Sequence, residues 1–274
     1  MSLSDIGKDW TELGKSDPLW AVLTEPGRRH GKWSDAEFMA TGIIQVNDDL
    51  DWLERHGICV PRGRALDFGC GAGRLTNALA KHFPEVVGVD IAEPMLQEAR
   101  RLDRSGGRVR FVHRAAPDLA CFENDSFDLV YTDRVLQHLP PDLARGYLRE
   151  LLRVARPGGA VVVGIPDRAK HPLVGLGARM IPPAVLRFVQ RRVLRYPAPM
   201  RMHPMPRHDI AAVATAHGGL LRGTKQYGRD PIWRHVRHVI LMGGGAETGL
   251  LSAASAPAAA PARPPGRRRP VTQP

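Results

Sequence analysis

The chain has 274 residues, of which 43% are hydrophobic, and it carries a formal net charge of +11. A chain of this length and composition can bury a full core, which excludes a small disulfide-stapled protein and a disordered one. Three cysteines without a C-x-x-C pair argue against a zinc module and an extracellular disulfide framework, and no run reaches the roughly 18 apolar residues of a membrane span.

The positive charge is unevenly distributed along the chain. Residues 1–166 hold 21 basic and 24 acidic residues, whereas residues 167–241 hold 14 and 3. We therefore expect five segments: a helical cap, a ligand-binding core, a basic lid insertion, a helix with the last strands, and a disordered Ala/Pro/Arg tail, over 1–60, 61–166, 167–206, 207–242 and 243–274. The N-terminus has charges where a secretory signal would be apolar, so we expect a cytoplasmic protein.

One helix of the cap has a clear start signal. Ser34 is placed to be its N-cap with Glu37 three residues later, and Trp33 and Phe38 occupy the two hydrophobic staple positions. Apolar residues then recur at helical spacing as far as Leu53. The pattern predicts a helix from about Asp35 to Leu53 with one face packed on the protein.

From Arg64 onward, short apolar runs alternate with helical stretches. Strands are expected at 64–68, 86–90, 108–112, 127–132 and 160–165, with helices at 72–82, 92–103 and 142–155. A further helix is expected at 207–217, and two final strands within 219–241. This alternation is typical of a doubly wound α/β fold with a parallel sheet covered on both faces.

A glycine-rich loop follows the first of these strands. The run LDFGCGAG places Gly69, Gly71 and Gly73 between a strand and a helix, where a doubly wound sheet holds its ligand. A dinucleotide-binding fingerprint needs a glycine at the position where this chain has Arg74. The sequence therefore argues against a nicotinamide cofactor. Asp90 ends the next strand, at the spacing of a carboxylate that binds ribose hydroxyls. An adenosine-bearing ligand is indicated.

Four features together carry a family resemblance. They are the D-x-G-x-G-x-G run, the strand ending in Asp90, the segment DSFDLVYTDRVLQHLP, and the RPGG turn before AVVVGI. In this order they resemble the class I S-adenosylmethionine-dependent methyltransferases. The resemblance implies a seven-stranded, mostly parallel sheet with an antiparallel last strand, and S-adenosylmethionine as cofactor.

The resemblance also implies roles for individual residues. Asp67 would orient the methionine amino group, the three glycines of the loop would pass beneath the cofactor, and Asp90 would hold the ribose. The remaining candidates for cofactor contact are Ile91 and Asp118 with Leu119, at the adenine, and Thr132, near the methyl group. Ile91 is equally compatible with plain core packing.

The end of the fourth predicted strand supplies the catalytic candidates, Asp133 and His138. A histidine suits proton transfer near neutral pH, and His138 lies in the family's motif IV region. The alternative is that His138 packs on the turn before Pro140. Some quinone-biosynthesis relatives carry acidic residues beside the matching histidine and bind a metal, but this chain has Arg134 and Gln137 there, so we expect no metal.

The basic insertion contains an amphipathic pattern over residues 183–196. Val185, Val189 and Val193 recur every fourth residue, beside a stripe of arginines. Three interpretations stay open: a lid helix on the protein, a surface that contacts anionic lipid or takes a lipid-like acceptor, and a nucleic-acid contact. The last is disfavoured because no nucleic-acid-binding module accompanies the arginines.

These observations favour a methyltransferase acting on a small or lipid-like acceptor, either free in the cytoplasm or in peripheral contact with a membrane surface. Two alternatives use the same crevice: a nicotinamide-dependent oxidoreductase and a non-catalytic S-adenosylmethionine-binding protein. The sequence does not identify the acceptor, the atom methylated or the oligomeric state.

Overall fold

The computed structural model describes residues 2–171, 185, 188–193, 195–200, 202–228 and 230–243. It contains a seven-stranded sheet in the order β3-β2-β1-β4-β5-β7-β6. Strands β1 to β5 pair in parallel, and β7 runs antiparallel to both β5 and β6. The predicted fold class is confirmed.

The strands follow the apolar runs of the sequence closely. Their bounds are Arg64–Phe68 (β1), Glu85–Asp90 (β2), Val109–His113 (β3), Phe127–Asp133 (β4), Ala155–Ala169 (β5), Gly219–Tyr227 (β6) and Trp233–Met242 (β7). Strand β5 runs past the predicted end at 165 because the antiparallel β7 pairs with it as far as Ala169, and it begins at Ala155, which pairs with Phe127 of β4.

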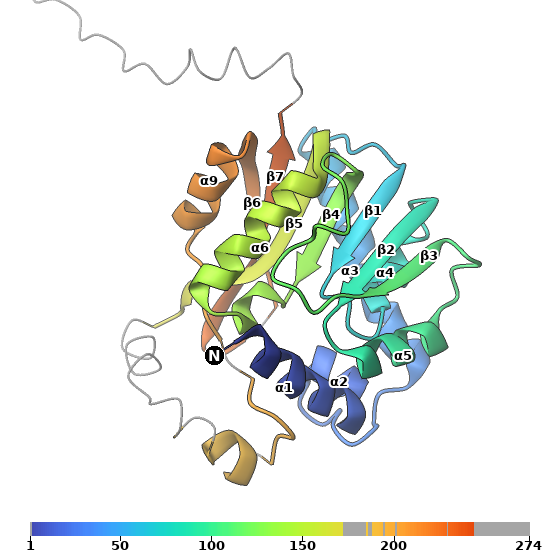
Figure 1. Ribbon diagram of the computed structural model, residues 1–274, viewed down its shortest axis with the longest axis vertical. Helices are drawn as coiled ribbons and strands as arrows, with labels where there is room; N and C mark the ends of the chain where they lie inside the picture. Colours follow the sequence, from blue (N-terminus) through green and yellow to red (C-terminus); the bar gives the residue numbers. More distant parts are fainter. Residues whose placement is uncertain are drawn as a thin grey trace, which may run out of the picture.

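Helices cover both faces of the sheet. They are α1 (Leu3–Ser16), α2 (Pro18–Val22), α3 (Asp35–Arg55), α4 (Arg74–Leu79), α5 (Glu93–Leu102), α6 (Pro141–Val154) and α9 (Arg207–Ala216), with a short 3₁₀ turn η1 (Leu136–His138). Helices α3 and α4 pack on one face, and α6 and α9 pack on the other. Figure 1 shows these two layers, with α1 and α2 at one end of the sheet.

The cap helix α3 begins as its sequence predicts. The Ser34 hydroxyl accepts a hydrogen bond from the Glu37 amide at 3.2 Å, and the Glu37 carboxylate accepts one from the Ser34 amide. The rings of Trp33 and Phe38 lie 6.1 Å apart, as in a hydrophobic staple. Val46 and Leu53 of this helix are buried in the core cluster that includes α4 and β1.

Helix α4 is shorter than the predicted 72–82. Gly73 has φ +78°, a left-handed conformation that a helix cannot include, so the helix starts at Arg74. The backbone therefore makes a tight turn immediately after β1. This turn places the glycine loop at the carboxyl end of the sheet.

The predicted amphipathic helix at 183–196 is only partly described, since 183, 184, 186, 187 and 194 lie outside the described residues. In the described part, Val185 and Phe188 are α-helical, as the pattern predicts, and Val189–Val193 forms one π-helical turn, η2. Phe188 and Val193 are exposed. Within the described ranges, no helix is both long and apolar enough to cross a bilayer. The predicted tail from 244 also lies outside them, and the five-segment division stays a prediction.

Candidate active site

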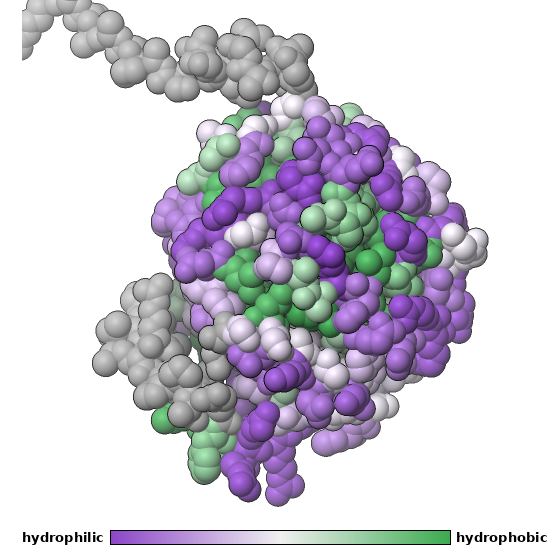
Figure 2. Space-filling view, in the orientation of Figure 1, coloured by the Kyte–Doolittle hydropathy of each residue, from purple (hydrophilic) through white to green (hydrophobic). Residues whose placement is uncertain are grey.

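A cavity of about 330 Å³ lies at the carboxyl ends of the parallel strands. Its walls come from the loop after β1, the end of β2, the segment after β4, helix α1, and the turn between β6 and β7. Hydrophobic side chains gather near the middle of the face drawn in Figure 2, surrounded by hydrophilic ones. The cavity lies in the crevice where a doubly wound sheet holds its ligand.

The glycine loop forms one wall of this cavity. Gly69 and Gly71 line it, and both have a positive φ, +72° and +52°. A Cβ at Gly69 would lie 2.2 Å from a Val135 methyl group, and one at Gly71 would lie 2.7 Å from Val22. Gly73 does not line the cavity; it caps α4 instead. The first two glycines therefore let the backbone reach the cavity surface.

Asp90 lies at the cavity wall, at the end of β2, as predicted. Its Oδ2 accepts a hydrogen bond from the Gly71 amide at 2.8 Å, and its Oδ1 accepts one from the Ala92 amide at 2.9 Å. Burial raises its pKa, against the lowering effect of these bonds. Each carboxylate oxygen can accept a second hydrogen bond, so the side chain is fixed in place with acceptor capacity left for a diol.

Several predicted cofactor residues do not line the cavity. Asp67 is buried and accepts a hydrogen bond from the Thr76 hydroxyl at 2.6 Å, and burial raises its pKa to about 7. Leu119 is fully buried in the core, and Thr132 is also buried. Asp118 is partly exposed and pairs with Arg114. Their roles toward the cofactor stay predictions.

Ile91 does line the cavity, and so does Arg114, which the sequence analysis did not single out. Arg114 follows β3, the strand after which the family resemblance places the adenine contact. Its position directly after the third strand was the signal in the sequence that could have found it.

Asp133 lies on the cavity wall but is held in a buried ion network. Its carboxylate accepts hydrogen bonds from Tyr227 Oη at 2.7 Å and Gln45 Nε2 at 3.0 Å. Three arginines approach the same carboxylate, at nitrogen–oxygen distances of 3.4 to 4.0 Å: Arg74, Arg134 and Arg237.

This network fixes the charge of Asp133. Burial by itself raises the pKa of the carboxyl, but Arg237 and Arg134 together with Tyr227 and Arg74 lower it, to about 2. A carboxylate with so low a pKa is a weak base at neutral pH. Its geometry favours a positioning role over the catalytic role expected from the sequence.

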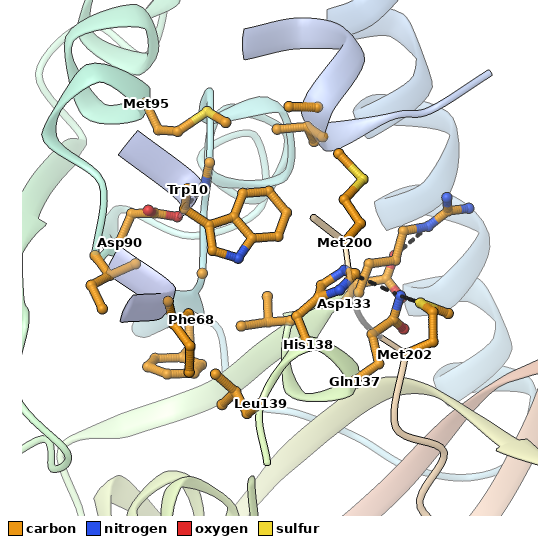
Figure 3. Close-up of a pocket in the computed structure, with 18 of the residues that line it drawn as sticks. Trp10, Phe68, Asp90, Met95, Asp133, Gln137, His138, Leu139, Met200 and Met202 are labelled. Carbon is orange, nitrogen blue, oxygen red and sulfur yellow. Dashed lines mark hydrogen bonds and ion pairs between the residues drawn. The ribbon is translucent and has the colours of Figure 1, made fainter. Parts of the chain in front are cut away.

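His138 also lines the cavity, as its position after β4 predicted. Its ring packs edge-on against the indole of Trp10, with centroids 5.2 Å apart, and Gln137 Nε2 lies 3.4 Å from its Nε2. In the view of Figure 3, Trp10 lies between Asp90 on one side and His138 with Met200 on the other. Both the packing role and the catalytic role of His138 are compatible with this placement.

The far side of the cavity is built from residues that the sequence analysis did not select. Helix α1 contributes Trp10, the β6–β7 turn contributes Asp230, and the start of β7 contributes Trp233 and His235. Two methionines of the basic insertion, Met200 and Met202, complete this wall. No motif marks these residues, because they come from segments far apart in the chain. Among the described residues, no three His, Cys, Asp or Glu side chains cluster as a metal site would require.

Comparisons with known proteins find methyltransferases. Residues 65–159 match the family model of a methyltransferase domain. A demethylmenaquinone methyltransferase of Clavibacter sepedonicus is 36% identical over 161 residues, which are 56% of this chain and 64% of that protein. A ubiquinone biosynthesis O-methyltransferase of Aromatoleum aromaticum is 31% identical over 139 residues, 50% of this chain and 58% of that protein.

Among solved structures, a magnesium protoporphyrin IX methyltransferase of Synechocystis PCC 6803 with bound SAH has the same fold. The TM-score is 0.60 at 19% identity, covering 88% of this chain and 100% of the other. The chain thus spans less than two thirds of the two curated relatives named above. The matched region contains the glycine loop and Asp90, so the resemblance drawn from these motifs is confirmed.

Proposed function

We propose that this chain moves a methyl group from S-adenosylmethionine to a hydroxyl group on a small, apolar acceptor, and the match of residues 65–159 to a methyltransferase domain supports this. The observation that carries this proposal is one continuous cavity. It joins Asp90 and the glycine loop to an apolar wall that includes Trp10, Met200 and Trp233.

The donor half of the cavity fits S-adenosylmethionine. Asp90 is rigidly placed to accept hydrogen bonds from the ribose hydroxyls, and Ile91 with Met95 offers an apolar surface to the adenine. Gly69 and Gly71 leave space beneath the cofactor. When bound, S-adenosylmethionine supplies a methyl group already activated by its sulfonium.

The acceptor half is mainly apolar with a few polar groups, as small-molecule sites usually are. Trp10, Trp233 and the two methionines would contact a flat hydrophobic acceptor, and Gln137 offers a buried Oε1 with no hydrogen-bond partner among the described residues. The relatives named for ubiquinone biosynthesis and demethylmenaquinone support a quinone-like or phenolic acceptor. A lipid tail on that acceptor is compatible with the apolar wall.

Orientation supplies most of the acceleration in this proposal. Holding an acceptor oxygen in line with the methyl group can contribute up to roughly 7–11 kcal/mol in well-oriented cases. Residues of α1, together with Tyr196, Met200 and Met202, come from outside the sheet to enclose the site. The match to a methyltransferase domain favours this function over the nicotinamide-dependent oxidoreductase.

A peripheral membrane contact is part of this proposal. Val185, Phe188 and Val193 expose apolar surface next to Arg191 and Arg192, a combination that favours an anionic lipid interface. We expect the protein to sediment with phosphatidylglycerol vesicles and not with phosphatidylcholine vesicles. Equal sedimentation with both, or with neither, would contradict this contact.

The function is tested by following methyl transfer directly. The protein is incubated with S-adenosylmethionine labelled in the methyl group and a panel of alkyl-substituted catechols and hydroxyquinones, and products are detected by mass spectrometry. Labelled methyl ethers together with S-adenosylhomocysteine are expected. Binding of S-adenosylmethionine without any methylated product across the panel would overturn the acceptor class, and would favour a non-catalytic binding protein.

A further inference from the structure

His235 of β7 and Asp230 of the β6–β7 turn meet at the acceptor side of the cavity. His235 and Asp230 both line it. The Asp230 Oδ1 accepts hydrogen bonds from the amides of Ile232 and Trp233, at 2.7 and 2.8 Å. These bonds fix the carboxylate as in an Asx turn, and its second oxygen, Oδ2, lies 3.3 Å from His235 Nε2.

The other ring nitrogen of His235 is unusual. Nδ1 is buried and has no hydrogen-bond partner among the described residues. Because Asp230 Oδ2 is a carboxylate oxygen, the contact with Nε2 favours the tautomer in which Nε2 carries the proton and donates it to Asp230. His235 thus lines the cavity and carries one ring nitrogen that the protein leaves unpaired, and such an atom points to a group from outside the protein.

We propose that His235, oriented by Asp230, is the general base that takes the proton of the acceptor hydroxyl. This inference rests on the proposed function. In the step, the acceptor oxygen forms a bond to the methyl carbon while the carbon–sulfur bond of the donor breaks, leaving its electron pair on sulfur. The hydroxyl proton passes to Nδ1, Asp230 stabilises the resulting imidazolium, and the proton then leaves to solvent.

The surroundings of His235 lower its pKa, which keeps the ring neutral as a general base requires. Burial lowers its pKa, and Arg134 at the end of β4 lowers it further, whereas Asp230 and Asp133 act in the opposite direction. Tyr227 on β6 packs against the ring at 5.8 Å, and Arg237 lies two residues along β7. The net shift is downward from 6.5, so the imidazole is neutral at pH 7 and can accept a proton.

His235 suits this role better than the two residues selected from the sequence. Asp133 is already committed to Tyr227, Gln45 and the surrounding arginines. His138 is packed edge-on against Trp10, whereas the Nε2 of His235 lies 3.3 Å from the Asp230 carboxylate. The pair of base and orienting carboxylate is the arrangement that activated nucleophiles use elsewhere.

The tautomer gives a first test that needs no turnover. Histidine-labelled full-length protein is studied by nitrogen-15 NMR with S-adenosylhomocysteine present, and the His235 signal is assigned by its loss in His235→Gln. We expect Nε2 protonated and Nδ1 unprotonated at pH 7, with an imidazole pKa below 6.5. Protonation at Nδ1, or a ring charged at pH 7, would overturn the proposal whether or not an acceptor is known.

The kinetic test uses the acceptor found by the methyl-transfer assay. His235→Gln should lower kcat by about 100- to 10,000-fold and remove the acid limb of the pH profile, while S-adenosylmethionine affinity changes little. Asp230→Asn should lower kcat less and shift that limb to lower pH. His208→Gln, on the exposed face of α9, is the matched control and should behave as wild type. A wild-type profile in His235→Gln, with its loss in His138→Gln, would assign the base to His138 and overturn the proposal.

Different results would overturn the proposed function and the assignment of His235 as the base. If the wild-type protein binds S-adenosylmethionine and methylates a carbon or an amine but no hydroxyl, the acceptor class fails and the general base for a hydroxyl is overturned with it. If hydroxyl methylation occurs at the same rate in His235→Gln, the proposed function stands and only the base assignment is wrong.

Discussion

The two halves of the cavity are built in opposite ways. The donor half comes from one short stretch of chain, from β1 through Gly69 and Gly71 to Asp90 at the end of β2. The acceptor half is assembled from α1, the segment after β4, the β6–β7 turn with the start of β7, and three residues of the basic insertion, Tyr196, Met200 and Met202. The contiguous half can be recognised as a motif, whereas the assembled half is defined only by the fold.

The buried network at Asp133 joins these halves, and breaking it should have the largest effect. Asp133→Asn removes the carboxylate that three arginines approach, so we expect the free energy of unfolding to fall by about 3–5 kcal/mol. Urea unfolding measures this. Asp142→Asn, which removes an exposed carboxylate paired with Arg145, is the control and should change stability little. Equal losses in the two variants would show that the network does not support the fold.

The same network predicts a pH dependence. The pKa of Asp133 is about 2 in the folded protein and 3.8 ordinarily. Because the folded value is depressed, the stabilisation is complete above about pH 4 and is lost as the pH falls through 2. The stability difference between wild type and Asp133→Asn should therefore shrink below pH 4. A difference that stays constant down to pH 2 would contradict the low pKa.

The contrast between the halves explains what the sequence could predict. Strand β1, the capped start of α3 and the positions of Asp90 and the glycine loop follow from local patterns, and the structure has them as expected. Trp10 and His235 lie 225 positions apart in the numbering, and no spacing rule connects them. Asp133 was found by position, but its ion network depends on Arg74, Arg237 and Tyr227 from three other elements.

The acceptor half can be probed through its aromatic wall. Trp10→Ala removes the indole that contacts His138, so the KM for the acceptor should rise on the order of tenfold, with a smaller change in the Kd for S-adenosylmethionine. Steady-state kinetics and calorimetry measure the two quantities. Trp10→Phe should restore most of the affinity. A larger effect on the donor than on the acceptor would move Trp10 to the donor half.

The smallest effect is expected at Asp118. The family resemblance implies that this residue contacts the adenine, but its carboxylate lies off the cavity wall, is paired with Arg114 and is 44% exposed. We therefore expect Asp118→Ala to change the Kd for S-adenosylmethionine less than about threefold, as for other exposed ion pairs. A rise of tenfold or more would extend the donor half beyond the cavity described above and restore the adenine contact.

The most direct test of the central claim is calorimetric titration of the protein with S-adenosylmethionine, S-adenosylhomocysteine and NAD. We predict that the two sulfur compounds bind and that NAD does not. Asp90→Ala should weaken their binding by about 1.5–3 kcal/mol, because it removes hydrogen bonds to a charged group, and Asp90→Asn should weaken it less. Binding of NAD alone, or no binding of either sulfur compound to the folded protein, would contradict the account.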